Sequence, residues 1–429
     1  MKSYISCIVA VFCLFCIANA TTWYVHPDST LNSIQDGMDM CATGDTVLVG
    51  AGTYTENLNF HGMAMTVMSE YGADTTIIDG SSPTHLDTGS VVMFISGEDT
   101  NSVIKGFTIT NGTGFNDPYW GAEGGGILCI SSSPMIADNI ICYNTAVWGG
   151  GIECFDNSHP IIMDNSIFNN TAGTGSNGGG GGIDMAFGSA PRIIGNLISA
   201  NTAPYAGGIS IDSLTQPLVR RNTITDNVAS LYGGGIGCYN NSSATIDSCV
   251  ISGNSTWGVQ SADSDTKINY CNIVDNVGYG VYNYGPDTID AEYNWWGDAS
   301  GPSGAGPGTG SMVSTYVDFD PWLTSPGIGE LIPSTTVRLS LQVSPNPFTK
   351  LTTVSFGIEH GAERMGLSIY DATGRLVKSF NQVSSIENQV SSVVWNGCDD
   401  HGRQLSSGVY FVQLVAGNCS TSQKVLLVR

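Results

Sequence analysis

The sequence predicts an all-β protein whose larger part is a parallel β-helix, a solenoid of short strands stacked coil upon coil. One observation is a glycine cluster, reduced to a single glycine in the last two copies. It precedes a β-branched residue every 22 to 31 residues, namely Ile127, Ile152, Ile183, Ile209, Ile236, Val259 and Val281. The second observation is an Asn-x-Ile-x-x-Asn motif that follows each of the first six of these β-branched residues. In the last two motifs Cys replaces the first Asn. Such a drifting period is typical of solenoids, whose repeats cannot bury a face alone.

Each repeat reads as short strands joined by tight corners. Around the glycine clusters the residues alternate, as in Ile152-Glu153-Cys154 and Ile183-Asp184-Met185, which predicts strands with the aliphatic and sulfur side chains inward. Glycines and asparagines between strands suit the positive-φ corners that a coil needs. Leucine-rich repeats are the rival solenoid, but their leucine spacing is missing. The 55 glycines exclude helical repeats.

The charge of the chain is unevenly divided. Residues 21–337 contain 5 basic and 31 acidic residues, whereas residues 338–429 contain 8 basic and 6 acidic ones. We expect the acidic part to repel nucleic acid and anionic lipid. No cofactor is indicated with certainty, although an acidic surface would suit Ca²⁺, and no Cys/His spacing suggests zinc.

The chain begins with the pattern of a secretory signal peptide, residues 1–20. Lys2 precedes an apolar core over residues 5–17, and Ala18-Asn19-Ala20 has the small residues of a cleavage site. No later stretch is long and apolar enough for a transmembrane segment. Nine cysteines follow, and Cys129 and Cys154 fall on neighbouring coils, where either a disulfide or a pair of buried thiols fits.

The N-terminal region predicts a capping helix followed by the first coils. Leu31, Ile34 and Met38 form an amphipathic pattern. This region resembles the opening of secreted right-handed parallel β-helix proteins of the pectin-lyase-like fold. The matching residues are Ile34-Gln35-Asp36, Gly44-Asp45-Thr46-Val47, Gly52-Thr53-Tyr54-Thr55-Glu56-Asn57 and Thr76-Ile77-Ile78-Asp79-Gly80. The resemblance implies a right-handed coil whose open end is covered by the helix, and it is silent about activity.

Two further resemblances concern the rest of the solenoid, predicted to span residues 21–325. The Gly-Gly-Ile and Ile-x-x-Asn pairs look like the repeats of polymorphic outer-membrane proteins, which are surface β-helices used in adhesion. Asn294-Trp295-Trp296-Gly297 and Val317-Asp318-Phe319-Asp320-Pro321-Trp322-Leu323 are similar to the last turns of secreted bacterial β-helices. We expect these aromatic side chains to close the far end of the coil.

A linker over residues 326–337 precedes a second β domain, residues 338–429. This segment resembles the C-terminal sorting domain of type IX secretion cargo. The matching motifs are Ser344-Pro345-Asn346-Pro347-Phe348, Gly374-Arg375-Leu376-Val377, Trp395-Asn396-Gly397 and Ser407-Gly408-Val409-Tyr410-Phe411. The resemblance implies a small immunoglobulin-like antiparallel sandwich, the type IX machinery as partner, and release or attachment at the cell surface after periplasmic transit. A related sandwich occurs in flagellar hook-capping proteins, so a plain structural module is the alternative.

Two sets of side chains are candidates for a functional site. Trp148, Tyr205 and Tyr232 each lie four residues before an inward Ile, and stacked coils would align them into a strip for sugar rings or for mutual packing. Glu153 and Asp184 fall on successive coils as surface acids about 5 Å apart, a spacing that suits paired catalytic carboxyls or bound Ca²⁺. The second Asn of each motif forms a ladder that we assign to structure.

These observations favour a secreted or cell-surface protein with a non-catalytic adhesion or glycan-binding role. The alternative is a polysaccharide-degrading enzyme, a hydrolase or a lyase, with Glu153 and Asp184 as its acids. The Gly-His-Gly and Arg-x-Lys motifs that polygalacturonase-type hydrolases carry are missing. A uronate lyase needs basic residues, of which the solenoid has only five.

Overall fold

The computed structural model describes residues 20–83, 89–173, 177–327, 339–358, 365–371, 375–383, 391–400, 402–416 and 419–429. The chain divides into two compact units, Met1–Leu331 and Ile332–Arg429. The expected signal peptide, apart from Ala20, lies outside the described residues, and so does the expected linker from residue 328 onward.

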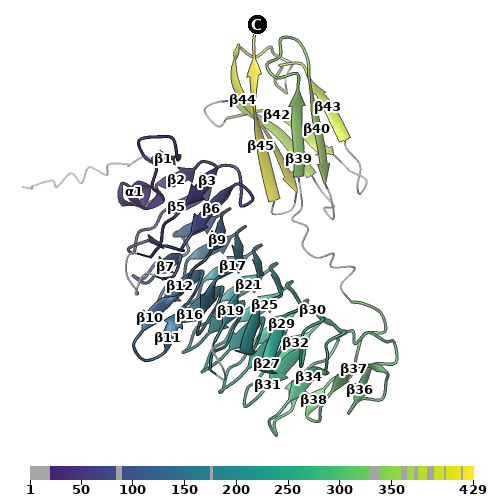
Figure 1. Cartoon of the computed structure of the whole chain (residues 1–429). Coiled ribbons are helices and arrows are strands. Elements are labelled where there is room, and N and C mark those ends of the chain that lie inside the picture. The colour runs from purple at the N-terminus through teal and green to yellow at the C-terminus, as the bar shows by residue number, and fades with distance from the viewer. Residues whose placement is uncertain are drawn as a thin grey trace, which may run out of the picture. The chain divides into compact units, whose positions relative to one another are not determined.

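The larger unit is a right-handed parallel β-helix, as the sequence predicts (Figure 1). Within the described residues, its parallel strands form sheets of twelve, nine and eleven strands, here called sheets 1, 2 and 3, and a smaller sheet 4. Sheet 1 contains, in order, β1 (Thr22–Val25), β2 (Thr46–Val49), β5 (Thr66–Ser69), β8 (Val103–Lys105), β13 (Met135–Ala137), β17 (Ile161–Met163), β21 (Arg192–Ile194), β25 (Leu218–Arg220), β29 (Thr245–Asp247), β32 (Lys267–Asn269), β35 (Ile289–Asp290) and β38 (Val317–Asp318).

The other sheets run alongside sheet 1. Sheet 2 contains β3 (Gly52–Tyr54), β6 (Thr76–Asp79), β9 (Thr108–Thr110), β14 (Ile140–Cys142), β18 (Ser166–Phe168), β22 (Leu197–Ser199), β26 (Thr223–Thr225), β30 (Val250–Ser252) and β33 (Asn272–Val274). Sheet 3 contains β4 (Leu58–Asn59), β7 (Val92–Phe94), β12 (Ile127–Ile130), β16 (Ile152–Phe155), β20 (Ile183–Met185), β24 (Ile209–Ile211), β28 (Ile236–Cys238), β31 (Val259–Ser261), β34 (Tyr279–Asn283), β37 (Gly310–Val313) and β36 (Pro302–Gly304). Sheet 4 contains β15 (Thr145–Ala146), β19 (Thr171–Ala172), β23 (Thr202–Tyr205) and β27 (Val228–Tyr232), and an antiparallel hairpin, β10 (Phe115–Asp117) with β11 (Gly121–Glu123), extends from one coil.

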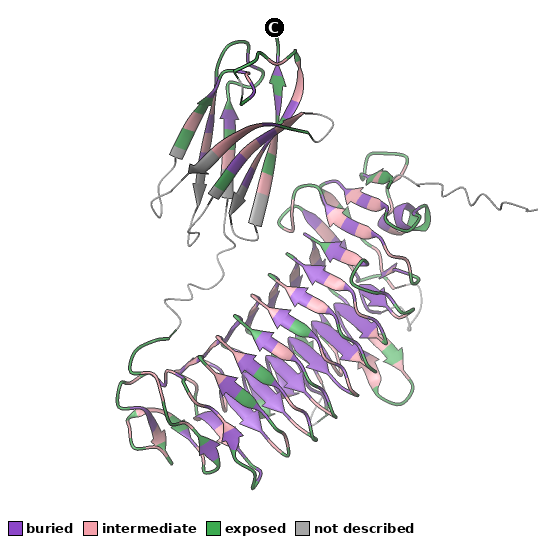
Figure 2. Cartoon of the chain, turned by 180° about the vertical axis from the view of Figure 1, so that it is seen from behind, coloured by how far each residue is buried: buried purple, intermediate pink, exposed green. Residues whose placement is uncertain are grey.

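The core is made of aliphatic columns that run the length of the solenoid, visible as rows of buried residues in Figure 2. The β-branched residues after the glycine clusters pair in register from coil to coil, for example Ile152 with Ile183 and Ile183 with Ile209. They are fully buried, as are the central isoleucines of sheets 1 and 2. The glycine cluster lets neighbouring coils approach closely, because a Cβ on Gly151 would lie 2.5 Å from the carbonyl oxygen of Gly182. The inward direction that alternation predicted is therefore confirmed.

Two ladders of buried amides fasten each coil to the next. In one of them, the Asn170 N–H and side-chain amide both donate to Oδ1 of Asn201, each at 3.0 Å, while Asn170 Oδ1 accepts the same pair of bonds from Asn144. The side-chain amide of Asn170 also donates to the Ile141 carbonyl oxygen. The other ladder joins Asn139, Asn165, Asn196 and Asn222, after which Cys249 and Cys271 take the place of Asn. Both ladders are structural, because each amide satisfies backbone groups at a corner.

The corners follow the sequence expectation in part, because several glycines and asparagines between strands have positive φ, as at Gly180, Asn157 and Asn240. The ladder asparagines do not adopt positive φ. The residue before each of them does, as at Tyr143 (φ 57°), Ala200 (φ 53°) and Asp226 (φ 56°). The stacked amides hold these residues in the left-handed region, which non-glycine residues rarely adopt on their own. The asparagine therefore satisfies the corner's backbone groups without adopting the left-handed conformation itself.

Both ends of the solenoid are closed. The α-helix α1 (Ile34–Asp39) covers the first coils, and the Glu56 carboxylate accepts hydrogen bonds from the Ile34 and Gln35 N–H groups at its N-terminus. At the far end Trp296 is fully buried, and Phe319 and Trp322 pack against the core. These findings agree with the predicted capping helix and aromatic closure.

The second unit is a two-sheet antiparallel sandwich. One sheet contains β39 (Leu339–Ser344), β40 (Thr352–Ile358) and β43 (Ser391–Trp395), and the other contains β42 (Leu376–Val383), β41 (Met365–Asp371), β44 (Gly408–Ala416) and β45 (Cys419–Leu427). Trp395 lies at the centre of its core, 5.2 Å from the Phe348 ring and 5.4 Å from the Tyr410 ring. No helix in the described part of the chain is long and apolar enough to cross a membrane. The described cysteine side chains are free thiols; Cys129 and Cys154 are paired in register and buried.

Replacing a ladder asparagine should destabilise the solenoid. Asn170→Ala removes the acceptor of the Asn144 bonds and the donor to Ile141 in a buried position. We expect a loss of about 2–4 kcal/mol in the free energy of unfolding, measured by chemical denaturation. The exposed Asn116→Ala is the control and should change it by less than about 0.5 kcal/mol. Equal effects of the two substitutions would contradict the assigned role of the ladder.

Candidate functional site

The outward face of sheet 3 carries a row of polar and small side chains. The strand register aligns one residue from each coil, and the row reads Leu128, Glu153, Asp184, Ser210, Gly237, Gln260 and Tyr282. Outward positions of a solenoid normally face solvent, yet Glu153 and Asp184 are only 1% and 3% exposed. The expectation that they are surface acids is therefore wrong, although they are paired on successive coils as predicted.

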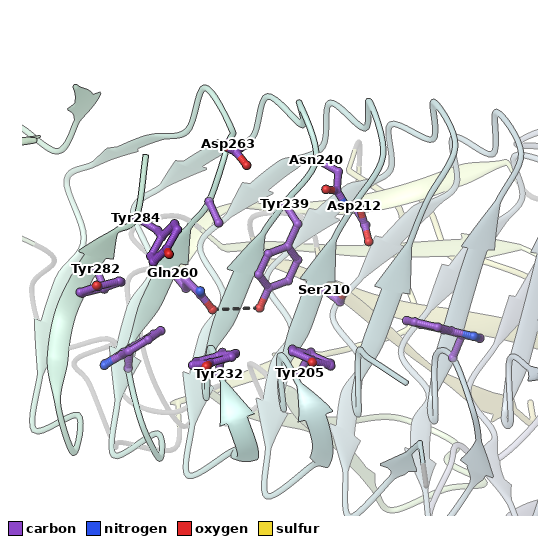
Figure 3. Close-up of a pocket in the computed structure, with 13 residues that line it drawn as sticks. Tyr205, Ser210, Asp212, Tyr232, Tyr239, Asn240, Gln260, Asp263, Tyr282 and Tyr284 are labelled. Atoms are coloured by element: carbon purple, nitrogen blue, oxygen red, sulfur yellow. Dashed lines mark hydrogen bonds between the residues drawn. The ribbon is translucent and has the colours of Figure 1, made fainter. Parts of the chain in front are cut away.

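A second row lies at the glycine corner beside sheet 3. Bridges between coils align Glu123, Trp148, Gly179 and Tyr205, and Tyr205 is paired with Tyr232. The structure thus brings the three predicted aromatic residues into one line, with an interruption at Gly179. Ring centroids are 6.1 Å apart for Tyr205 and Tyr232, 5.6 Å for Tyr232 and Trp257, and 4.4 Å for Trp257 and Tyr282. Figure 3 shows the Tyr205 and Tyr232 rings edge-on and side by side, so that ring faces turn toward the cavity above them.

These two rows form the wall and floor of a groove. Its volume is about 770 Å³, and it is lined by Trp148, Tyr205, Ser210, Asp212, Tyr232, Tyr239, Asn240, Trp257, Gln260, Ala262, Asp263, Tyr282 and Tyr284. The opposite wall comes from the turns after the sheet 3 strands, which contribute Asp212, Asn240 and Asp263. A groove with aromatic faces on one side and hydrogen-bonding groups on the other is suited to sugar rings.

Tyr239 crosses the floor of the groove because the row has a glycine at that coil. A Cβ on Gly237 would lie 2.2 Å from the Tyr239 hydroxyl oxygen, so the ring occupies the space of the missing side chain. The Tyr239 hydroxyl donates to Gln260 Oε1 at 3.1 Å (Figure 3). Burial, followed by the charge of nearby groups, raises the pKa of Tyr239, so the hydroxyl stays neutral. It is a fixed polar group in the middle of the groove.

A smaller cavity of about 230 Å³ continues the groove toward the N-terminal coils, and we call it the acid pocket. It is lined by Trp120, Glu123, Trp148, Glu153, Phe155, Asp184, Ala186, Phe187, Asp212, Ser213 and Asn240. Trp148, Asp212 and Asn240 line both cavities, which shows that the two adjoin. Glu123, Glu153 and Asp184 are its carboxyl groups of lowest exposure.

Burial changes the protonation of these three acids. It raises the pKa of Glu123 to about 7, with smaller contributions from the charges of Asp117 and Asp184. Burial also raises the pKa of Asp184 to about 7 and holds the pKa of Glu153 well above its usual range, and the Asp184 charge raises Glu153 further. The Ser210 hydroxyl and a hydrogen bond between the two carboxyls lower the pKa of Asp184, and the second of these raises the pKa of Glu153, which favours a neutral Glu153 and an ionised Asp184. Near neutral pH the pocket therefore holds both protonated and ionised carboxyl groups.

The hairpin β10–β11 covers the acid pocket. Its Trp120 carbonyl oxygen accepts a hydrogen bond of 3.1 Å from the Trp148 indole N–H. The Trp120 ring lies 5.5 Å from Phe187, which in turn lies 4.9 Å from Phe155. These rings shield the acids from water and account for their burial.

Sequence reasoning missed several of these residues. Glu123 directly precedes a glycine cluster, in line with Trp148, and this position could have identified it. Trp257 and Tyr282 belong to weaker repeats of shifted spacing, and Trp120 lies on a hairpin outside the period. Within the described residues, no group of three or more His, Cys, Asp and Glu side chains has an arrangement that could hold a metal ion.

Two family models match parts of the chain. The right handed beta helix region matches residues 174–295, and the FlgD Ig-like domain matches residues 342–420. The first agrees with the right-handed coil. The second matches most of the antiparallel sandwich in the second unit. No curated protein sequence matches the chain.

Three solved structures are similar to parts of the chain at low TM-scores. Dimeric latent PorU from Porphyromonas gingivalis is 22% identical over 21% of this chain and 9% of its own, with a TM-score of 0.19. A pectin methylesterase in complex with a hexasaccharide is 13% identical over 74% of this chain and 98% of its own (TM-score 0.28). Tailspike protein 4 of bacteriophage CBA120 is 10% identical over 89% of this chain and 63% of its own (TM-score 0.30). Similarities this low carry no argument about function.

The buried acids should make stability depend on pH. A carboxyl with a raised pKa in the folded state stabilises the protein fully below its unfolded pKa, and that contribution is lost as pH rises through the folded value. We therefore expect the melting temperature to fall between pH 4 and pH 8. Asp184→Asn removes this titrating group, so the unfolding free energy of the variant should decrease less over the same pH range. The difference from the unsubstituted protein should be on the order of a few kcal/mol. The control is Asp74→Asn, which replaces an exposed acid and should leave the pH profile of stability unchanged. A pH profile that Asp184→Asn does not alter would contradict the assignment.

Proposed function

We propose that this protein is a secreted or cell-surface glycan-binding protein whose ligand lies in the groove on sheet 3. The observation that carries the proposal is the row of Tyr205, Tyr232, Trp257 and Tyr282 beside the hydrogen-bonding floor of a groove of about 770 Å³. The rings provide apolar faces for sugar C–H groups, and Tyr239, Gln260 and Asp212 provide polar groups for hydroxyls.

The charge of the groove narrows the class of glycan. Among the described residues that line the groove and the acid pocket there is no Lys, Arg or His, whereas Asp212, Asp263 and the three buried acids are present. A polyuronate would be repelled unless cations such as Ca²⁺ bridged it to the protein. The proposed ligand is therefore a glycan without acidic groups, bound as part of an adhesion role.

The second candidate function is a polysaccharide hydrolase. The adjoining Glu153 and Asp184 favour it, because one neutral and one ionised carboxyl are the groups that such chemistry uses. A uronate lyase is disfavoured, since neither cavity has a basic residue among its described lining. Release of reducing ends that Glu153→Gln abolishes would establish the hydrolase; binding without release would leave the non-catalytic role.

The second unit supports a proposal about export. Its sandwich and sorting motifs favour recognition by the type IX secretion machinery, and the signal-like residues 1–20 favour earlier passage into the periplasm. The protein would then be released or held at the outer-membrane surface. The match to the FlgD Ig-like domain leaves a plain structural module as the alternative.

Binding should depend on the aromatic row. Trp257→Ala removes a ring that lies between Tyr232 and Tyr282, so it should weaken binding of a neutral oligosaccharide about 10-fold. Calorimetry should record this as a loss of about 1.4 kcal/mol in binding free energy. The matched control is Tyr270→Ala, which removes an exposed ring stacked on Tyr293 at a different corner. Equal weakening by both substitutions would argue against the groove as the binding site.

Export should depend on the second unit. A chain lacking residues 338–429 should keep its solenoid but accumulate in the periplasm, because the sorting signal is gone. Fractionation and surface labelling of the native host measure this, with the full-length chain as the control. Efficient surface display of the shortened chain would overturn the sorting proposal.

A further inference from the structure

The acid pocket contains groups that the protein itself leaves unsatisfied. Glu153 Oε2 and Asp184 Oδ1 are buried and accept no hydrogen bond from the described part of the chain. Both residues are more than nine-tenths buried and line the pocket. Buried carboxyl oxygens without partners are costly, so the arrangement points to a ligand that supplies hydrogen-bond donors.

A gap in the aromatic row leads to these oxygens. Gly179 holds the position between Trp148 and Tyr205, and a Cβ there would lie 3.5 Å from Asp184 Oδ1 and 3.2 Å from Ser210 Oγ. The φ of Gly179 is not in the left-handed region, so the backbone does not require glycine at this position. The absence of a side chain instead leaves room beside Asp184 and Ser210, next to Trp148, which lines both the groove and the pocket.

The electrostatics of the pocket favour a cation. Around Glu153 and Asp184, the charged and titratable neighbours are Glu123 on β11, Asp117 on β10, Asp212 after β24, the Cys154 thiol on β16 and the Tyr239 hydroxyl after β28. No basic side chain is among the described lining residues. Trp120, Trp148, Phe155 and Phe187 surround these acids with aromatic rings, which attract cations through their faces. An ammonium group would supply both the hydrogen-bond donors and the missing positive charge.

We propose that the acid pocket binds an amino sugar of the glycan held in the groove, with its ammonium group directed at the free oxygens of Glu153 and Asp184. This inference rests on the proposed glycan-binding function and specifies its ligand class. A sugar is favoured over another amine because the pocket adjoins the groove through Trp148, Asp212 and Asn240. A glycan in the groove thereby presents its end ring at the Gly179 gap.

The test compares two oligosaccharides that differ only at nitrogen. Calorimetry with the full chain at pH 6.5 measures binding of a glucosamine tetramer and of its N-acetylated form, which has no charge. The glucosamine tetramer should bind at least about 10-fold more tightly, because a desolvated ammonium among carboxylates and rings is strongly favoured. Its affinity should rise from pH 5 to pH 6, where the carboxyls begin to ionise and the amine keeps its proton, while that of the acetylated form should not.

Three variants locate the effect. Asp184→Asn keeps the shape of the side chain and should remove the preference for the amino form. Gly179→Tyr fills the gap without changing an acid and should also remove it. Trp257→Ala should weaken both tetramers alike. Circular dichroism confirms that each variant is folded.

The outcomes separate the two proposals. Equal binding of the two tetramers, still weakened by Trp257→Ala, would overturn the amino-sugar site and keep the glycan groove. No binding of either tetramer or of neutral oligosaccharides would overturn both. A linear diamine that competes as well as the glucosamine tetramer would show that the pocket recognises an amine without a sugar, and would overturn the assignment.

Discussion

The register between coils is the constraint on which the rest of the structure depends. Short strands such as β16 and β20 bury little on their own, and they are held because ladder amides such as Asn144 and Asn170 bond to the amide one coil away. The ladders also fix the left-handed residues at the corners, so each coil must turn at the same place as its neighbours. One continuous aliphatic core results.

The same register builds the candidate functional face. A position that recurs once per coil becomes a line of side chains along the solenoid, so small changes in single repeats place unlike residues side by side. Glu153, Asp184 and Ser210 are such a series on sheet 3. Glycines at single positions matter for the same reason: Gly237 makes room for the Tyr239 ring, and Gly179 opens the aromatic row beside Asp184. On this scaffold, the character of a binding surface depends on how residues differ at equivalent positions of successive coils.

The sequence predicts periodic features well. Spacing alone placed Glu153 beside Asp184 and aligned Trp148, Tyr205 and Tyr232, because these positions follow directly from counting between inward isoleucines. It did not predict that the acids are buried, since the covering ring of Trp120 comes from a hairpin that interrupts the period. Trp257 and Tyr282 were missed because shorter repeats shift their spacing. At the corners with stacked amides, the left-handed residue lies one place before the ladder asparagine, since the asparagine side chain bonds to the neighbouring coil, whereas Asn157 and Asn240 at other corners are left-handed themselves.

The most direct test of the central claim is a structure of the full chain with a bound oligosaccharide. We expect sugar rings against the faces of Tyr232 and Trp257, with one end of the ligand at the gap beside Gly179. A ligand bound on another face, for example at the exposed Tyr270 and Tyr293, would contradict the claim that the outward face of sheet 3 is the binding surface.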